Sequence, residues 1–331
     1  MQILVTGGTG FIGSHTVVSL LNQNDDVVII DNLMKSHPSV IDAIHEITGK
    51  KPIFYTCDIR DQAMLEHVFS RHTFDAVIHF AGLKAVGESV EQPLLYYQNN
   101  VEGSITLFRV MQKYNCQTIV FSSSATVYGL DNISPLKETM PTEPINPYGQ
   151  TKAMIETILK DLHHADAWRV ALLRYFNPIG AHPSGLIGEN PKDTPNNVMP
   201  LIVQVARKQR PSFMVFGNNY DTPDGTGIRD YVHVMDLAEA HIKALNYIQS
   251  QNACCEVLNI GTGQGYSVLE LIKTFASVNQ VQVPYTIGKR RPGDVAICYA
   301  DSQKAFNLLH WQPKHNLKSM VKDSYHYDPK A

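Results

Sequence analysis

Three side chains that can move a proton are predicted to lie close together. Tyr148 and Lys152 are four residues apart at the start of a predicted helix, so both project from one face of it. Ser124 ends the run Ser122–Ser124, which closes a predicted strand. Because α/β sheets hold their ligands at the carboxyl ends of strands, we expect Ser124 beside Tyr148. Taken alone, Tyr148 could equally be an aromatic residue packed at a helix start.

A glycine-rich loop near the N-terminus favours dinucleotide binding. Residues 7–13 read GGTGFIG, directly after a predicted strand and at the opening of a predicted helix. Glycine lets the backbone approach a pyrophosphate, and the free N–H groups of the helix start point at the anion. A glycine triplet alone is weak evidence, but the flanking strand and helix strengthen it.

Two acidic residues follow the next two predicted strands. Asp31 ends the second strand about 20 residues after the glycine loop, where a carboxylate accepts hydrogen bonds from the adenosine ribose and repels a 2′-phosphate. This favours NAD over NADP. Asp58 follows the third strand and could contact the adenine edge, although it could equally cap a helix.

With NAD as the oxidant, Tyr148, Lys152 and Ser124 can be assigned roles in the oxidation of an alcohol. Oxidation of an alcohol needs a base for the hydroxyl proton while the hydride leaves carbon. Free tyrosine, with a pKa of about 10, is a poor base at neutral pH. The Lys152 ammonium and the positive nicotinamide favour the phenolate of Tyr148, and a fall of about 3 units corresponds to roughly 4 kcal/mol. Ser124 can orient the substrate hydroxyl and relay its proton.

The composition excludes several other classes of protein. The chain has 331 residues, of which 44% are hydrophobic and 18% charged, and its net charge is −3. No run of basic residues is long enough to follow the phosphate backbone of a nucleic acid. The five cysteines lack metal-ligand or disulfide spacing, so we expect no metal site, and Cys254 and Cys255 are read as the start of a strand. The first residues resemble neither a signal peptide nor a spanning helix. We expect a cytoplasmic protein with no membrane partner.

Short apolar runs alternate with amphipathic stretches in the first half of the chain, which predicts an α/β fold with a parallel, doubly wound sheet of the Rossmann type. The predicted strands are Gln2–Thr6, Val27–Asp31, Ile53–Cys57, Ala76–Phe80, Thr118–Ser122, Trp168–Tyr175 and Val257–Ile260. The predicted helices start near Phe11, Asp61, Glu91 and Tyr148 and cover about 197–209 and 234–249.

The Pro- and Gly-rich texture after Phe176 marks a second lobe. We expect an NAD-binding domain over 1–176, to which the chain returns at about 232–262, and a smaller mixed α/β substrate lobe over 177–331.

Eight ordered stretches resemble the extended short-chain dehydrogenase/reductase family, and within it the UDP-glucose 4-epimerases. They are Val5–Gly13, Phe80–Val90, Ser122–Gly129, Tyr148–Lys152, Arg174–Pro178, Asn196–Pro200, Gly225–Val234 and Arg290–Asp294. The resemblance covers essentially the whole chain. It implies reversible interconversion of UDP-galactose and UDP-glucose through a 4-keto sugar, with NAD held throughout.

The resemblance also assigns site residues. Those expected at the cofactor are Gly7, Gly10, Phe11, Ile12, Gly13, Asp31, Asn32, Asp58, Ile59, Phe80, Ala81, Gly82, Lys84, Asn99, Tyr148, Lys152 and Phe176. Those expected at the UDP-hexose are Ser124, Asn177, Asn197, Phe216, Arg229, Arg291, Asp294 and Cys298. Tyr148, Lys152 and Ser124 are the catalytic residues, with Tyr148 the proton acceptor. Arg229 and Arg291 suit a pyrophosphate because guanidinium groups match phosphate oxygens, and Phe216 offers an apolar surface for uracil.

Related enzymes that oxidise C4 and then eliminate water or carbon dioxide carry carboxylates directly after the serine. The 4,6-dehydratases that resemble this chain have Asp-Glu there, and the decarboxylases a Glu, whereas this chain has Ala125 and Thr126. The absence favours simple return of the hydride. Epimerisation of a UDP-uronic acid and a catalytically silent NAD-binding sensor stay open as alternatives, although the combination of Ser124, Tyr148 and Lys152 argues against a sensor.

Cys298 and the oligomeric state carry two further hypotheses. Relatives with a bulky tyrosine at the position of Cys298 tend to exclude N-acetylated sugars, so the smaller residue predicts room for UDP-GlcNAc and UDP-GalNAc. Alternatively, Cys298 merely packs beside Tyr299. The resemblance also implies a homodimer, with contact faces on the helices near 91–114 and 148–164.

Overall fold

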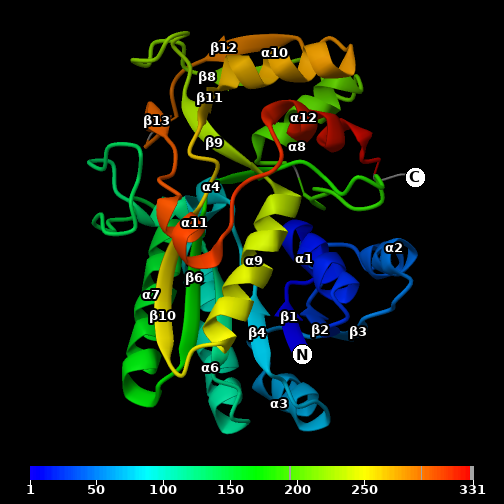
Figure 1. The fold of residues 1–331 in the computed structure, drawn as a ribbon. Helices are drawn as coiled ribbons and strands as arrows, with labels where there is room; N and C mark the ends of the chain where they lie inside the picture. Colours follow the sequence, from blue (N-terminus) through cyan, green and yellow to red (C-terminus); the bar gives the residue numbers. More distant parts are fainter. Residues whose placement is uncertain (194, 292, 329–331) are drawn as a thin grey trace.

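The computed structural model describes residues 1–193, 195–291 and 293–328. Its centre is a seven-stranded parallel sheet in the order β10-β6-β5-β4-β1-β2-β3 (Figure 1). The strands are β1 (Gln2–Thr6), β2 (Asp26–Asp31), β3 (Ile53–Thr56), β4 (Ala76–His79), β5 (Thr118–Ser124), β6 (Arg169–Tyr175) and β10 (Cys254–Ile260). This order reverses direction between β1 and β4, which confirms the doubly wound α/β fold.

Helices cover both faces of this sheet. On one face lie α1 (Phe11–Asn22), α2 (Ser39–Thr48), α9 (Val234–Gln249) and α11 (Gln303–Leu309). On the other face lie α3 (Gln62–Arg71), α6 (Gly103–Lys113) and α7 (Pro147–Asp166). The connection between β4 and α6 consists of α4 (Val86–Glu91), α5 (Pro93–Tyr96) and the π-helix η1 (Tyr97–Glu102).

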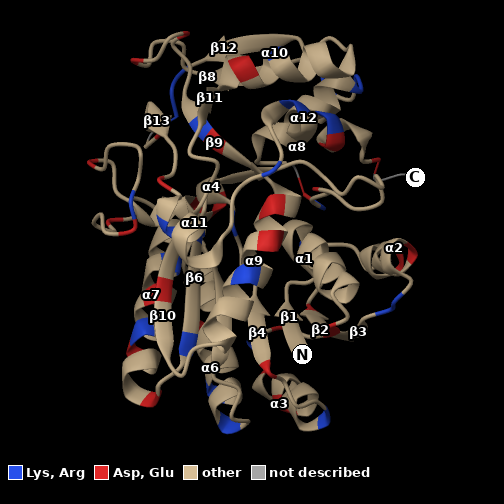
Figure 2. Ribbon diagram, in the orientation of Figure 1, with Lys and Arg blue, Asp and Glu red and all other residues tan. Residues whose placement is uncertain are grey.

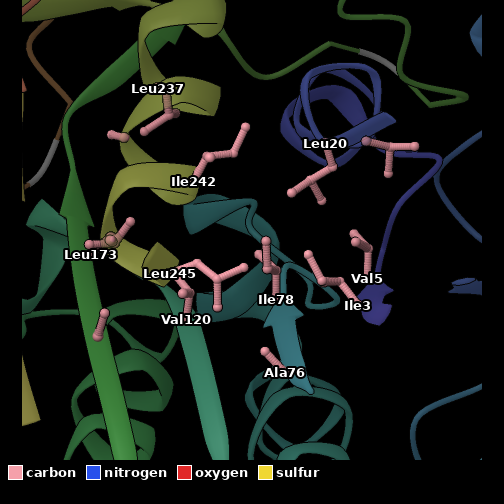
Figure 3. Close-up of a cluster of buried hydrophobic side chains, with 14 of the residues drawn as sticks. Ile3, Val5, Leu20, Ala76, Ile78, Val120, Leu173, Leu237, Ile242 and Leu245 are labelled. Atoms are coloured by element: carbon pink, nitrogen blue, oxygen red, sulfur yellow. The ribbon is translucent and has the colours of Figure 1, made fainter. Parts of the chain in front are cut away.

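The buried strands read as continuous apolar runs because both of their faces are covered. Figure 3 shows one of the two cores, in which Leu237, Ile242 and Leu245 of α9 face Val120 of β5 and Leu173 of β6. All five side chains are at most 3% exposed. Helix α9 therefore covers the sheet, although segments of the second lobe both precede and follow it in the sequence.

The second lobe lies beyond the carboxyl edge of the central sheet (Figure 1). Its strands are β7 (Asn177–Ile179), β8 (Phe213–Phe216), β9 (Ile228–His233), β11 (Gly265–Ser267), β12 (Tyr285–Gly288) and β13 (Ile297–Cys298). Its helices are α8 (Val198–Ala206), α10 (Val268–Asn279) and α12 (Leu317–His326). They share a separate apolar core that includes Ile202, Phe275 and Val321, each at most 3% exposed.

Several predicted elements differ from the structure. Helices α2 and α4 and strands β7, β8 and β9 were not expected, and the helix predicted to start near Glu91 is divided into α5, η1 and α6. Strand β5 extends two residues further than predicted, to Ser124, and β10 begins at Cys254. Short strands in a Pro- and Gly-rich stretch have too few residues to show an alternating pattern, which explains why they were missed.

Charge and membrane features agree with the composition. Lys and Arg alternate with Asp and Glu over both lobes in the view of Figure 2. No helix within the described ranges combines the length and the apolar character needed to cross a membrane.

The glycine loop shows why its composition is restricted. A methyl group on Gly13 would overlap the carbonyl oxygen of Gly7 and lie 2.9 Å from the Cα of Gly8. Gly7 itself has a φ of +69°, and a methyl group there would lie 2.7 Å from the backbone nitrogen of Ala81. Strand β1, helix α1 and the residues after β4 can therefore pack this closely only around glycine.

We predict that Gly13→Ala lowers the free energy of unfolding by at least about 2 kcal/mol, because the backbone of the loop must move to admit the methyl group. Denaturant unfolding measures the loss. Gly87→Ala is the matched control: Gly87 lies in α4 with no neighbour within 4 Å of the added methyl group, so its stability should change by less than about 1 kcal/mol. Equal effects of the two changes would contradict the packing argument.

Candidate active site

The carboxyl edge of the central sheet assembles the predicted site residues. Because all seven strands are parallel, the segments that follow β1, β2, β3, β4, β5 and β6 emerge on one side. These segments carry Gly7, Asp31, Asp58, Phe80 and Ser124. Phe176 follows β6 and is 6% exposed. The second lobe faces the same edge, so the site lies between the two lobes (Figure 1).

The glycine loop is shaped to receive an anion. Its turn is closed by a hydrogen bond from the Gly10 nitrogen to the Gly7 oxygen, 3.1 Å, and the Gly7 nitrogen donates to Ile30 of β2. Helix α1 begins after Gly10, which has no side chain to cap it. The first N–H groups of the helix are thus directed at the loop without a side-chain acceptor, as a bound diphosphate requires.

Asp31 lies at the end of β2 and faces the glycine loop. Its carboxylate accepts hydrogen bonds from the backbone nitrogens of Thr9 (3.2 Å) and Leu33 (2.9 Å) and from the hydroxyl of Ser36 (3.1 Å). The side chain is held in one orientation beside the place where the loop leaves room for a dinucleotide. This position suits the role predicted for it at the adenosine ribose.

Asp58 is held by neighbours on its own side of the sheet. Arg60 donates to both of its oxygens, at 2.9 and 2.8 Å, and the amide of Asn32 donates to it at 2.9 Å. The hydrogen bonds from Arg60 hold the pKa of Asp58 well below its usual range. Helix α3 is capped by Asp61 and not by Asp58. Asp58 is therefore an ionised acceptor at the sheet edge, which removes the helix-cap alternative.

Ser124 and Tyr148 meet where β5 ends and α7 begins. The Ser124 hydroxyl oxygen accepts from the backbone nitrogen (3.2 Å) and the hydroxyl (3.0 Å) of Thr126. The Ser124 hydroxyl donates its own proton in a hydrogen bond to Tyr148. Burial raises the pKa of Tyr148 above its ordinary value, and the hydrogen bond with Ser124 opposes this shift. The protein alone thus favours the neutral phenol, whereas the lowering that we expect comes from Lys152 and the positive nicotinamide together.

Lys152 is 4% exposed, and its ammonium nitrogen donates to the carbonyl oxygen of Ser122 at 2.7 Å. It lies 4.8 Å from the centre of the Phe121 ring and 5.9 Å from that of Tyr148. Burial lowers the pKa of Lys152 to about 7, with the charge of Glu156 opposing this shift. A lysine with this pKa is close to losing its charge at neutral pH. An anion bound beside it would raise its pKa and keep it protonated.

The loop after β4 passes beside Lys152. A methyl group on Gly82 would lie 3.8 Å from the Lys152 nitrogen. Asn100 fixes this loop, since it accepts from the Leu83 nitrogen at 2.8 Å, donates back to the Leu83 oxygen and donates to Thr151 of α7. Asn99, which was predicted to contact the cofactor, is 6% exposed and donates to Asn100.

Glu189 joins a predicted cofactor residue to a predicted substrate residue. One of its oxygens accepts from the Lys84 ammonium at 2.9 Å and from the amide of Asn197. Asp193 and Lys35 pair at 2.5 Å nearby, and the Lys192 ammonium donates to the Leu33 oxygen at 2.6 Å. The 189–193 segment of the second lobe is thereby tied across to the loops that follow β2 and β4.

Four predicted UDP-binding residues form two pairs on the second lobe. The Arg291 guanidinium lies 3.9 Å from the centre of the Phe216 ring, and Arg229 of β9 lies 3.5 Å from Asp294. One face of Phe216 is thus covered by an arginine, so this face supports the guanidinium and not a uracil. Pro292, within the matched Arg290–Asp294 stretch, lies outside the described residues.

Comparisons with known proteins agree with this geometry. A family model described as GDP-mannose 4,6 dehydratase matches residues 4–324. The UDP-glucose 4-epimerase of Bacillus subtilis (strain 168) is 53% identical over 328 residues, which cover 99% of this chain and 96% of that protein. The chain belongs to the UDP-glucose 4-epimerase family.

Two solved structures of this family are similar over nearly the whole chain. The UDP-glucose 4-epimerase of Stenotrophomonas maltophila, with bound NAD and formylated UDP-arabinopyranose, is 48% identical, has a TM-score of 0.96 and covers 99% of this chain, which covers 97% of it. The enzyme of Bifidobacterium longum, in complex with NAD+ and UDP, is 47% identical with the same TM-score over 100% of this chain and 98% of that one.

The family model bears the name of a dehydratase, a reaction that needs an acid and a base beyond the hydride-transfer residues. This chain has no carboxylate directly after Ser124. Ala125 packs against an apolar cluster that contains Phe176, and the Thr126 hydroxyl is bound to Ser124. The site in this epimerase family member is therefore equipped for oxidation and reduction at one carbon only.

Two predicted substrate-binding residues, Asn177 and Cys298, lie in short strands of the second lobe that pair with β9. Asn177 begins β7 and is exposed, and its strand pairs with β9 in register with Tyr231. Cys298 in β13 pairs in register with Arg229 of β9 and packs against the same cluster as Ala125 and Phe176. It thus lies beside the predicted diphosphate-binding arginine and the cluster that contains Phe176.

Four polar residues near the site were not predicted: the buried Asn100, Glu156 and Arg174, and the partly exposed Glu189. Glu156 could have been suspected, because a second charge four residues after Lys152 continues the same buried helix face. Arg174 stands in the predicted strand Trp168–Tyr175, where a charge among apolar residues signals a buried ion pair. Asn100 and Glu189 form hydrogen bonds to the loop after β4, and no local sequence pattern indicates these partners.

We predict that Ser124→Ala lowers kcat of this family member at pH 7 by about 10- to 100-fold. Losing the hydrogen bond raises the pKa of Tyr148, so the ascending limb of the kcat profile should move to higher pH. Thr126→Val keeps the Ser124 hydroxyl and serves as the control, with a smaller loss and an unmoved limb. A profile of Ser124→Ala that coincides with the wild type would contradict this role.

Proposed function

We infer that the protein catalyses the reversible 4-epimerisation of UDP-galactose and UDP-glucose with tightly bound NAD. The observation that carries this inference is the meeting of Tyr148, Ser124 and Lys152 at the sheet edge that also holds the glycine loop, with no additional carboxylate after Ser124. The geometry supports a base for one sugar hydroxyl and nothing that would eliminate a second group.

The chain's residues divide the proton chemistry among them. Tyr148 takes the proton of the C4 hydroxyl, and Ser124 orients this hydroxyl and relays the proton. Lys152, held by the Ser122 carbonyl, places positive charge beside the phenol. When bound, NAD supplies the acceptor and the later donor of the C4 hydride, together with a positive ring. The residues that fit it are the glycine loop, Asp31 and Lys152.

Inversion requires the keto sugar to present its second face while the nucleotide stays bound. Binding free energy must therefore be concentrated on UDP, with the hexose held loosely. Arg229 and Arg291 are positioned for this on the second lobe, since one is paired with Asp294 and the other supported by Phe216. We propose this division of labour between an NAD-binding domain over 1–176 and a UDP-binding lobe over 177–331, of which residues 194, 292 and 329–331 lie outside the described part.

Conversion of UDP-galactose to UDP-glucose by the purified protein without added NAD tests the function. The expected result is turnover together with close to one NAD released per chain on denaturation. UDP-glucuronate in the same panel tests the uronic acid alternative. Bound NAD with no conversion of any UDP-sugar would instead favour a silent sensor.

We further propose that Cys298 admits N-acetylated UDP-hexoses. The thiol lies between Arg229 and the cluster around Phe176, and burial raises its pKa to about 11, so it stays a small neutral wall at physiological pH. A tyrosine in its place would fill the space that an acetamido group needs.

Cys298→Tyr should reduce activity on UDP-GalNAc more than about 10-fold while preserving activity on UDP-galactose, because one added steric clash discriminates by a few kcal/mol. Cys298→Ser keeps the size and should preserve both activities. Equal loss of both activities in Cys298→Tyr would show that Cys298 packs without acting as a gate.

We propose in addition that the protein is a homodimer. Leu94 is 82% exposed, Val90 61% and Met154 38%, on neighbouring helices α5, α4 and α7. A groove beside them is lined by Val101, Met154 and others of α7. Large apolar side chains that gather on one helical face suit a two-fold, self-complementary contact.

Light scattering of the purified protein should give the mass of two chains. Met154→Glu should shift the mass toward one chain, whereas Phe306→Glu, which changes an exposed aromatic on α11, should not. A single-chain mass for the wild type, or equal masses for both variants, would contradict the proposed contact face.

A further inference from the structure

One helical turn beyond Lys152 on α7 lies a buried ion pair that the proposed reaction does not use. Arg174 of β6 and Glu156 of α7 are each 2% exposed. The arginine binds the carboxylate with two hydrogen bonds, Nε to Oε1 at 2.9 Å and Nη2 to Oε2 at 2.6 Å. A buried pair of this kind contributes little net stability compared with apolar residues, so its presence calls for a different reason.

The pair is continuous with the catalytic residues. Tyr148, Lys152 and Glu156 follow one another at intervals of four residues along one face of α7. Each meets one serine of β5: Tyr148 meets the Ser124 hydroxyl, Lys152 the Ser122 carbonyl, and Glu156 the Ser123 hydroxyl at 2.5 Å. In the sheet, Ser123 lies in register with Arg174 of β6. Arg174 therefore fixes the strand end that carries Ser124.

Arg174 makes two further hydrogen bonds through Nη1. Its Nη1 donates to the Tyr128 hydroxyl at 3.1 Å and to the Glu138 carbonyl at 3.3 Å, and the guanidinium lies 4.9 Å from the centre of the Tyr128 ring. Tyr128 donates onward to Asn259 of β10 at 2.7 Å. This arrangement leaves the arginine no freedom to follow a ligand, so it acts as a fixed charge.

Without Arg174, Glu156 would be the nearest counter-charge for Lys152, one helical turn away. Lys152 would then be drawn toward Glu156 and away from Ser122 and Tyr148. We propose that Arg174 is a positioning residue for the reaction: by holding both oxygens of Glu156, it cancels this carboxylate and leaves the Lys152 ammonium directed at Tyr148. This inference rests on the epimerase function proposed above and assigns Arg174 and Glu156 no contact with substrate.

The electrostatic surroundings of Tyr148 and Lys152 are dominated by neutral groups, which makes this pair important. His79 of β4 faces Lys152, and burial lowers its pKa to about 3, so it is neutral. The other titratable groups of the described residues that face the helix stripe are Tyr96 of α5, Lys160 of α7, Tyr175 of β6, Cys255 of β10, Tyr128 and Glu138. Burial raises the pKa values of the tyrosines at 96, 128 and 175 and of Cys255, so they too are neutral.

The experiment is the pH profile of kcat for UDP-galactose conversion by NAD-loaded enzyme. Arg174→Met leaves Glu156 uncompensated, which should disfavour the phenolate and move the ascending limb to higher pH by about one unit. Glu156→Gln leaves Arg174 uncompensated and should move the limb to lower pH. The double variant, Arg174→Met with Glu156→Gln, removes both charges and should return the limb toward the wild-type position even where Arg174→Met alone folds poorly.

Lys160→Met is the control, because Lys160 also lies 3.7 Å from Glu156 but is 40% exposed and screened by water. Its profile should match the wild type. The inference is overturned if the limb of Glu156→Gln coincides with that of the wild type, which would leave the pair a purely structural role. Absence of turnover in the wild type would instead overturn the proposed function, so the two failures are distinguishable.

Discussion

The structure depends on keeping a phenol ionisable in a place that disfavours its charge. Tyr148 lies where burial raises its pKa, and Lys152 lies where burial lowers its pKa to about 7. Each group alone resists its charged form. In the proposed mechanism the phenolate and the ammonium stabilise each other, because opposite charges attract more strongly in a low dielectric. The reactive state is therefore a pair that becomes favourable together, and it requires both side chains to be held on one face of α7.

This requirement explains the architecture around the pair. The parallel sheet places the end of β5 beside the start of α7, and its three serines bind Tyr148, Lys152 and Glu156 in successive helical turns. The glycine loop brings the dinucleotide to the same edge. In the proposed function the second lobe contributes arginines for UDP, so that the nucleotide is held while the hexose turns within a less specific pocket.

The sequence predicts the sheet and the shared helix face of Tyr148 and Lys152 well because both are encoded locally. Apolar runs with flanking glycines predict the strands to within a few residues, and Tyr148 and Lys152 need only helical spacing to share a face. The rest depends on contacts between distant segments. Glu189 reaches Lys84 across 105 positions, and Arg291 covers the Phe216 ring although they are far apart in the chain. The raised pKa of Tyr148 could not be predicted from the sequence either, because residue spacing does not show how deeply a side chain is buried.

The most direct test of this account is an ultraviolet difference titration of tyrosinate in the NAD-loaded enzyme, with the Tyr148→Phe enzyme subtracted. The account predicts one tyrosinate that forms with a pKa about 3 units below the ordinary value of about 10, and its absence from the variant, which should also lose turnover while retaining NAD. A Tyr148 that ionises only above pH 10 in the NAD-loaded enzyme, or a Tyr148→Phe enzyme that converts UDP-galactose as fast as the wild type, would contradict it.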